Sequence, residues 1–330
     1  MILGGTADLM APDQCCEILM NQSFPKPVDH PLSVEDLRHH HPIPVLAVIG
    51  DDATRITSIA HPRDAAAGSI AFIARADDDA QRLITTSQAS VLVMKVDADP
   101  RPGQCYLKVN DPHLWYIAAL GLLFAPHTAP MIDSSARIAA TARVGRNCRI
   151  GAFSVVEAGC KIGDHVEIGD HVTIKQGSQI GNDCVIQHHV TIGSEGVAFH
   201  RAADDSWHFF PHHGIAWIGD GVAIGSHCVI VRGMLQNTVV GSGCKLGNYV
   251  NVAHNCEIGE NCWISSKVLL CGGVRLEPDV RLASAVSISS YVQVGRAARI
   301  GLGSVVTKDV PQGASMFGNP AKPLRTMRSF

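Results

Sequence analysis

The chain has 330 residues, 46% of them hydrophobic, and a formal net charge of -3. This length allows two or three domains with full cores, and the slightly acidic balance argues against nucleic acid as a partner. The first residues lack a basic region followed by an apolar core, and the longest apolar run, residues 114–124, is too short to cross a bilayer. We therefore expect no stable membrane insertion.

The front of the chain predicts a leader followed by a small α/β domain. Prolines punctuate residues 1–29, and Ser33 is suited to cap a short helix. Strand-like runs follow at residues 45–49, 70–73, 90–96 and 105–109. A helix over residues 112–124 closes a domain expected over residues 30–125, with Pro126 marking the joint.

A six-residue repeat fills most of the remaining chain. An aliphatic residue recurs at every sixth position over residues 132–192, 218–230 and 240–306. Glycine often follows it, and a small side chain often stands two positions before it. A coil of three hexads, or about 18 residues, fits a triangular parallel β-helix. We expect this domain over residues 126–310, with a tail over residues 311–330.

Eleven cysteines raise the question of disulfides or metal binding. Seven of them share the small inward slot of the repeat, and no C-x-x-C pair occurs. These seven are Cys148, Cys160, Cys184, Cys228, Cys244, Cys256 and Cys262. We predict that they pack as small apolar side chains in a reducing, cytoplasmic compartment. Histidine clusters at residues 39–41, 188–189 and 212–213 lack a cysteine or carboxylate at ligand spacing, so no metal site is expected.

An insertion over residues 193–217 interrupts the repeat, and it is polar, aromatic and rich in histidine. Insertions in a solenoid commonly form binding surfaces that the repeats themselves do not provide. Trp207, which lies in this insertion, is therefore a candidate substrate-binding residue. The alternative is a packing loop or a contact between subunits.

The segment Val252-Ala253-His254-Asn255 stands inside the repeat, downstream of the break at residues 193–199. Together with the hexads and with Arg232-Gly233, these motifs resemble the bacterial UDP-3-O-acylglucosamine N-acyltransferase family of lipid A synthesis. Residues 31–112 are similar to the uridine-binding domain of that family. The resemblance implies a mainly β fold, in which a left-handed parallel β-helix follows an α/β uridine-nucleotide-binding domain. It also implies a homotrimer with active sites between subunits.

The same resemblance implies the substrates. A 3-hydroxyacyl chain would move from the thioester of acyl carrier protein to the 2-amino group of UDP-3-O-acylglucosamine. The phosphopantetheine of the donor carries the acyl group, so no separate cofactor is expected.

The chemistry also points to particular residues. An amine that attacks a thioester must lose a proton, and a neutral histidine suits this task near pH 7. His254 is therefore the predicted general base, and Gly272, one coil later, is placed to offer its N–H to the oxyanion. Asn248 and Asn255 are candidates to orient the histidine or the sugar. The alternative is that His254 only caps a corner of a coil.

Three positions of the β-helix depart from the family's pattern. Gly247 and Asn251 stand where the family has aspartate and glutamine, and Tyr291 stands where it has a second histidine. Asn251 nevertheless occupies a substrate-binding position, so we retain it as a candidate.

In the front domain, Phe72 matches the family, but its uracil-contacting asparagine and tyrosine are replaced by Arg75 and Asp78. Phe72 and Arg75 are therefore the candidate nucleotide-binding residues. Three functions stay open: the lipid A N-acyltransferase, a paralogue that acylates another nucleotide amino sugar from acyl carrier protein or acyl-CoA, and a binding trimer without activity.

Overall fold

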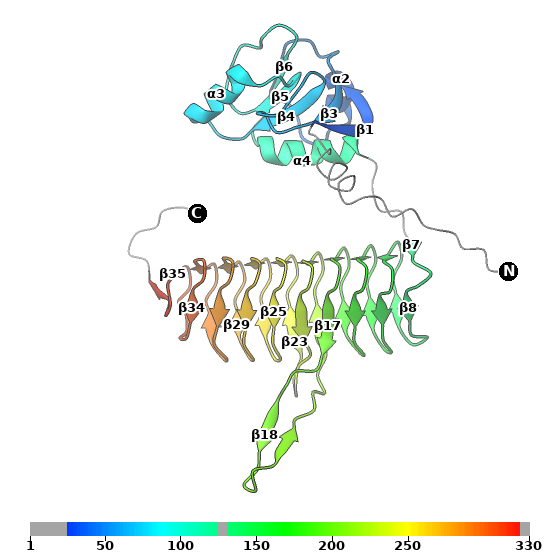
Figure 1. The fold of residues 1–330 in the computed structure, drawn as a ribbon, viewed down its shortest axis with the longest axis vertical. Helices are drawn as coiled ribbons and strands as arrows, with labels where there is room; N and C mark the ends of the chain where they lie inside the picture. The colour runs from blue at the N-terminus through cyan, green and yellow to red at the C-terminus, as the bar shows by residue number, and fades with distance from the viewer. Residues whose placement is uncertain (1–24, 125–130, 324–330) are drawn as a thin grey trace, which may run out of the picture. The chain divides into compact units, whose positions relative to one another are not determined.

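A computed structural model describes residues 25–124 and 131–323, and the chain divides into two compact units, Met1–His127 and Thr128–Phe330 (Figure 1). The first unit is a small α/β domain and the second is a parallel β-helix. The predicted fold class, mainly β with a left-handed parallel β-helix behind a small α/β domain, is therefore confirmed. Within the described ranges, no helix has the length and apolar character needed to span a bilayer.

The first unit is built on a six-stranded sheet in the order β1-β3-β4-β5-β6-β2. Its strands are β1 (Lys26–Ser33), β2 (Ala47–Ile49), β3 (Arg55–Ile59), β4 (Ser69–Ile73), β5 (Val91–Met94) and β6 (Cys105–Lys108). Its helices are α2 (Val34–His40), α3 (Asp78–Thr86) and α4 (Pro112–Leu123). The side-chain oxygens of Ser33, Asp77 and Asp111 accept backbone N–H groups that the three helix starts leave free.

The boundary expected after residue 29 is wrong, because β1 begins at Lys26 and pairs antiparallel with β3. Pro27 and Pro31 obscured this strand in the sequence. Proline is tolerated here because β1 lies at the edge of the sheet, where a missing N–H need not break the ladder. Residues 1–24 of the expected leader lie outside the described residues.

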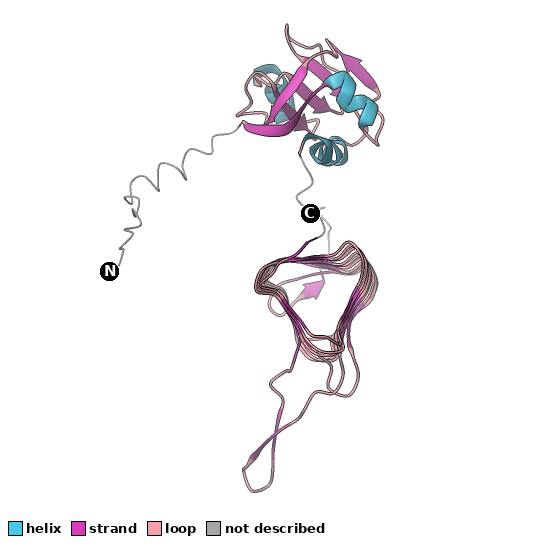
Figure 2. Cartoon of the chain, turned by 90° about the vertical axis from the view of Figure 1, so that its right-hand side faces the viewer, coloured by secondary structure: helices cyan, strands magenta, loops and turns pink. Residues whose placement is uncertain are grey.

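The second unit stacks its strands in three sheets, which form the faces of a prism with a triangular cross-section (Figure 2). The β7 face contains β7 (Met131–Ile132), β10 (Arg149–Ile150), β13 (Glu167–Ile168), β16 (Val185–Ile186), β21 (Ala223–Ile224), β24 (Lys245–Leu246), β27 (Trp263–Ile264), β30 (Arg281–Leu282), β33 (Arg299–Ile300), β35 (Ser315–Phe317) and β36 (Lys322–Pro323). The β8 face contains β8 (Arg137–Ile138), β11 (Val155–Val156), β14 (Thr173–Ile174), β17 (Thr191–Ser194), β22 (Val229–Val231), β25 (Asn251–Val252), β28 (Leu269–Leu270), β31 (Ser287–Ile288) and β34 (Val305–Val306). The β9 face contains β9 (Arg143–Val144), β12 (Lys161–Ile162), β15 (Gln179–Ile180), β20 (Ala216–Ile218), β23 (Thr238–Val240), β26 (Glu257–Ile258), β29 (Arg275–Leu276) and β32 (Gln293–Val294).

Equivalent residues of successive coils lie in columns, because paired strands are one coil apart, as Asn251 and Leu269 are. Aliphatic side chains such as Val252 point inward and are fully buried. The seven cysteines of the inward slot are buried and unpaired, and Cys256 Sγ donates to the carbonyl oxygen of Cys271 at 3.2 Å. The cysteines therefore pack as the sequence predicts.

The edge between the β7 and β8 faces carries a continuous stack of rings. Phe153, His171, His189, His227 and Tyr249 follow one another with centroids 5.2, 4.9, 4.8 and 5.0 Å apart. All five residues have φ between 56° and 62°, the left-handed conformation that each corner requires. His189, weighed above as a metal ligand, belongs to this stack. Among the described residues, no three His, Cys, Asp or Glu side chains are placed to hold a metal ion.

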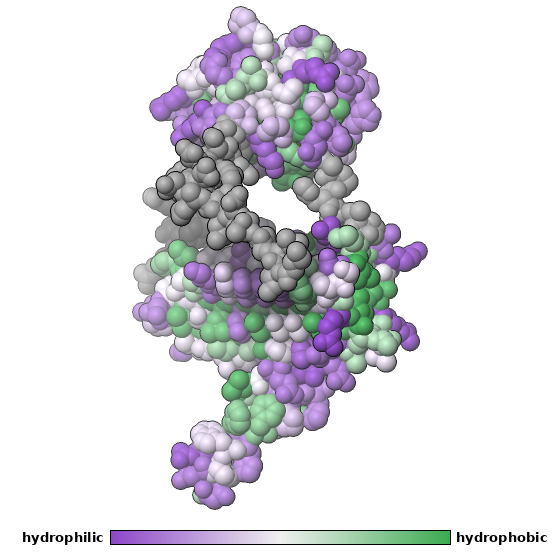
Figure 3. Space-filling model, turned by 45° about the vertical axis from the view of Figure 1, so that its right-hand side comes forward, coloured by the Kyte–Doolittle hydropathy of each residue, from purple (hydrophilic) through white to green (hydrophobic). Residues whose placement is uncertain are grey.

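Two insertions leave the β-helix where the β8 and β9 faces meet, which we call the arm edge. The first projects as an arm, in which β18 (Phe199–Arg201) pairs antiparallel with β19 (Trp207–Phe209) (Figure 1). In the space-filling view, hydrophobic residues gather toward the base of the arm and hydrophilic ones at its tip (Figure 3). The second insertion, residues 232–237, packs under the first, since the N–H of His213 donates to the carbonyl oxygen of Met234 at 2.7 Å.

The tail expected over residues 311–330 is partly wrong. β35 pairs with β33 and extends the β7 face, and β36 folds back antiparallel on β35. The last coil of a β-helix leaves unpaired backbone groups, and these strands satisfy some of them. Residues 324–330 lie outside the described residues.

Candidate active site

His254 lies on the arm edge, in the corner that follows β25. The next coil along this edge contains Gly272 and Gly273, because β25 and β28 are paired. The N–H of Gly273 donates to the carbonyl oxygen of His254 at 2.9 Å. The coil length therefore predicts correctly that His254 and Gly272 are neighbours.

The absence of a side chain at Gly272 leaves room for the imidazole of His254. A Cβ at this position would lie 2.6 Å from His254 Cε1 and 2.8 Å from Nε2, so the ring rests against the bare Cα. Among the described residues, the N–H of Gly272 donates to no protein acceptor. An unused backbone donor therefore lies beside the ring of a histidine, where an oxyanion needs one.

The arm brings a second histidine to the same place. His212 is only 2% exposed, and its ring lies edge-on to that of His254 with centroids 5.5 Å apart at 76°. Its Nδ1 bonds to the carbonyl oxygen of Phe210 at 3.0 Å. Its Nε2 and the Nδ1 of His254 are both buried without a hydrogen-bond partner in the described ranges. Sequence reasoning missed this pair, although the insertion joins β17 to β20 and therefore must leave from the edge that carries His254.

The surroundings of His254 favour its neutral form. Burial lowers the pKa of the imidazole below its ordinary value, and the nearby His212 lowers it further. The neighbouring Asn255 side chain raises this pKa and so opposes these two effects in part. A neutral imidazole near pH 7 is the form that accepts a proton, so His254 is suited to act as a base.

The three candidate asparagines fall at different places. Asn255 lies beside His254 and anchors the corner, because its Oδ1 accepts the N–H of Met234 at 2.7 Å. Asn248 lies at the other edge of β25, where its Oδ1 accepts the N–H of Ser226 at 2.9 Å. Asn251 is exposed on the β8 face between the two edges. Asn248 therefore lies away from His254 of its own chain, since six residues move the chain to the next edge. Its expected role toward the histidine or the sugar stays a prediction for a site between subunits.

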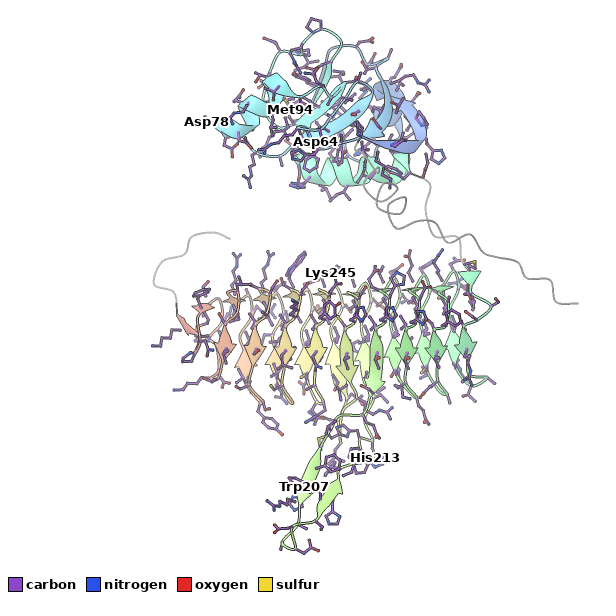
Figure 4. All side chains as sticks on the ribbon, in the orientation of Figure 1. Asp64, Asp78, Met94, Trp207, His213 and Lys245 are labelled. Carbon is purple, nitrogen blue, oxygen red and sulfur yellow. The ribbon has the colours of Figure 1, made fainter. Side chains whose placement is uncertain are left out.

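The arm places Trp207 on β19, away from the base of the arm (Figure 4). There the guanidinium of Arg201 lies 5.8 Å from the centroid of its ring. Tyr291 lies closer to His254, because a Cβ on Gly273 would be 2.6 Å from Tyr291 Cδ1. Of Trp207 and Tyr291, it is thus Tyr291 that borders the corner next to His254 within one chain.

The first unit has a pocket of its own, with a volume of about 500 Å³. Phe72 and Arg75 both line it, together with His113 and Tyr116. The rings of His113 and Tyr116 lie 4.6 and 4.7 Å from that of Phe72. Asp78 does not line this pocket, because it begins α3 and points away as an exposed residue. Asp78 thus contributes no wall to this pocket.

A known protein family matches parts of the β-helix. The family described as bacterial transferase hexapeptide (six repeats) matches residues 141–176, 159–194 and 237–272. Residues 141–194 and 237–272 of the β-helix thus resemble the repeat of this family. The last matched range contains His254 and ends at Gly272.

The chain is similar to curated proteins named UDP-3-O-acylglucosamine N-acyltransferase. The one from Pseudomonas syringae pv. tomato is 35% identical over 231 residues, which cover 63% of this chain and 64% of that protein. The one from Neisseria meningitidis serogroup B is 34% identical over 229 residues, which cover 63% and 65%. The match therefore spans just under two thirds of the length of these relatives.

Solved structures of UDP-N-acetylglucosamine acyltransferases have a similar fold. The Francisella novicida structure has a TM-score of 0.54 and 26% identity, and it covers 59% of this chain and 70% of its own. The Bacteroides fragilis structure has a TM-score of 0.53 and 26% identity, with 59% and 74% covered. These likenesses agree with the parallel β-helix fold.

Proposed function

We propose that this protein is an N-acyltransferase of lipid A biosynthesis, which moves a 3-hydroxyacyl chain from acyl carrier protein to the 2-amino group of UDP-3-O-acylglucosamine. One observation carries the proposal: a half-buried His254 of lowered pKa rests against Gly272, whose N–H is unused. The names of the curated relatives supply the substrate class.

The reaction follows from these two residues. The imidazole of His254 takes a proton from the attacking amine as its nitrogen bonds to the thioester carbonyl carbon. The N–H of Gly272 donates to the oxyanion of the tetrahedral intermediate. The carbon–sulfur bond then breaks, and the imidazolium returns its proton to the leaving thiolate of phosphopantetheine. The products are an amide and a free thiol, with no other reactant needed.

The acceptor would be held by its nucleotide in the first unit. Phe72 offers an aromatic ring to a base, and stacking on such a ring contributes about 1 to 3 kcal/mol. Arg75 supplies a cation for the phosphates in the same pocket. This pocket supports a uridine nucleotide as the handle of the acceptor, and Asn251 and Trp207 remain candidates for contact with the rest of the substrate.

The active protein would be a homotrimer with its sites between subunits. The outward positions of the β8 face carry no charged side chain from β11 to β34. The other two faces carry charged residues at equivalent positions, such as Glu167 and Arg275. A long uncharged face is typical of a contact between copies. Thioester donors and unpaired buried cysteines also support a cytoplasmic location.

A paralogous activity on another nucleotide amino sugar is the second candidate. Tyr291 covers Gly273 beside the proposed oxyanion donor, in a position where the resembling family has histidine. An aromatic ring there changes the shape and the hydrogen bonding offered to the acceptor. The donor of such a paralogue would be acyl carrier protein or acyl-CoA.

His254→Ala tests the proposal. We expect turnover to fall by about 10² to 10⁴, the usual contribution of a positioned general base. The matched control is His165→Ala, a corner histidine on another edge, which should keep wild-type turnover. Initial rates of amide formation measured by mass spectrometry, with thermal unfolding of each variant, decide the matter. Unchanged turnover in a folded His254→Ala protein would show that the base lies elsewhere.

A further inference from the structure

A groove runs along the β7 face over its last coils, beside the edge that it shares with the β8 face. Two cavities of about 350 and 330 Å³ lie end to end there and share Trp263 and Ser265 in their linings. The floor is low because small residues follow the strands, namely Gly247, Ser265, Ala283 and Gly301. The outward side chains of four successive strands, Lys245, Trp263, Arg281 and Arg299, form one wall.

The charges along this wall are not balanced. Arg281 and Arg299 are exposed and directly paired in register, so their guanidinium groups leave strands that lie about 4.8 Å apart. Neither side chain forms a hydrogen bond or ion pair with a described residue. Two acidic side chains of the neighbouring edge already have partners: Glu277 accepts from the backbone N–H of Arg296, and Asp279 accepts from its guanidinium. Like charges directly opposite each other destabilise a sheet, and an anion between them would remove this cost.

Trp263 offers an open aromatic surface beside this cationic pair. The side chain is 57% exposed, and its indole N–H donates to Ser265 Oγ at 3.2 Å, which fixes the orientation of the ring. Within the part of the chain that the structure describes, no other ring and no cation covers Trp263. Exposed tryptophan beside paired arginines is suited to a ligand with a flat ring and a negative charge.

The groove is separate from the His254 site of the same chain. It lies on the β7 face, whereas His254 lies where the other two faces meet. Figure 4 shows Lys245 on the side of the β-helix opposite to Trp207 and His213 of the arm. A ligand in this groove would therefore be bound without contact to His254 of its own subunit.

We propose that this groove binds a phosphorylated nucleoside, with the base on Trp263 and phosphate oxygens between Arg281 and Arg299. Two sources share this chemistry: the uridine diphosphate of the acceptor and the adenosine 3′,5′-bisphosphate part of coenzyme A. The choice of these two nucleotides rests on the proposed function, but the binding of a phosphorylated nucleoside in the groove does not. Coenzyme A in the groove would identify an acyl-CoA donor, whereas uridine diphosphate would identify a second contact for the acceptor.

Calorimetry on the full chain tests the inference, with uridine diphosphate, adenosine 3′,5′-bisphosphate and pyrophosphate as probes. All proteins carry Phe72→Ala, which weakens the pocket of the first unit. Arg281→Gln/Arg299→Gln should raise the dissociation constant of the nucleotide that binds about tenfold or more. Trp263→Leu should weaken that nucleotide about fivefold or more and leave pyrophosphate unchanged. The matched control is Arg143→Gln, an outward arginine on the β9 face, which should change nothing.

Three results would overturn the inference: no binding of either nucleotide, affinities unaffected by the arginine changes, or dissociation of the assembly by those changes. The last result would make the groove a contact between subunits. His254→Ala separates the two proposals, because it should lower turnover by about 10² to 10⁴ and leave nucleotide binding in the groove intact.

Discussion

Gly272→Ala is the substitution whose effect follows most directly from the structure. Its Cβ would lie 2.6 Å from His254 Cε1, whereas carbon atoms pack at about 3.5 to 4.0 Å, so the ring must retreat by roughly 1 Å. A misplacement of about 1 Å costs a catalytic group about 10² in rate. Overpacking of this kind lowers the free energy of unfolding by about 1 to 3 kcal/mol. We therefore expect kcat/KM to fall about a hundredfold in a protein that still folds.

The assay is the initial rate of amide formation, with calorimetric unfolding to follow stability. Gly159→Ala is the matched control, because it lies on the same edge and its Cβ would meet nothing within 4 Å. Its φ of 69° makes alanine unfavourable, so this variant should lose some stability and keep its rate. Wild-type kcat/KM in Gly272→Ala would refute the packing of a catalytic His254 against Gly272.

Three further predictions concern other parts of the molecule. His212→Gln removes one of the groups that lower the pKa of His254, so this pKa should rise. The acidic limb of the pH–rate profile should then move to higher pH. An unmoved limb would show that His212 does not tune the base. Phe72→Ala should raise the dissociation constant for a uridine nucleotide about tenfold, measured by calorimetry, and an unchanged affinity would remove the first unit from acceptor binding. Leu269→Glu places a charge on the uncharged β8 face and should convert a trimer to monomers, as measured by sedimentation. Turnover should be lost with the trimer. A stable trimer would locate the subunit contact elsewhere.

The β-helix was predictable because its signal is long and periodic. Each hexad contributes one strand and one corner, so the number of residues between two positions tells how many coils and faces separate them. The same arithmetic places Gly272 against His254 without knowledge of any side chain. It also places Asn248, six residues before His254, on another edge of the same chain.

The arm and the chain termini were harder to predict, because they follow no period. Nothing in the sequence fixes how an insertion folds back, so the contact between His212 and His254 depends on tertiary packing alone. The first strand was obscured by Pro27 and Pro31, which only an edge position permits. β35 was missed because the aliphatic repeat ends before Ser315, although the last coil still needs a partner strand.

The measurement that tests the proposed function most directly is a mass-spectrometric search for amide product. The purified protein is incubated with UDP-3-O-acylglucosamine and 3-hydroxyacyl-acyl carrier protein, and in parallel with other UDP-amino sugars and with acyl-CoA donors. The lipid A assignment predicts a new N-acylated UDP-sugar with the first pair and its near absence with His254→Ala. An amide formed only from another amino sugar would favour the paralogue, and no amide from any pair would contradict an N-acyltransferase.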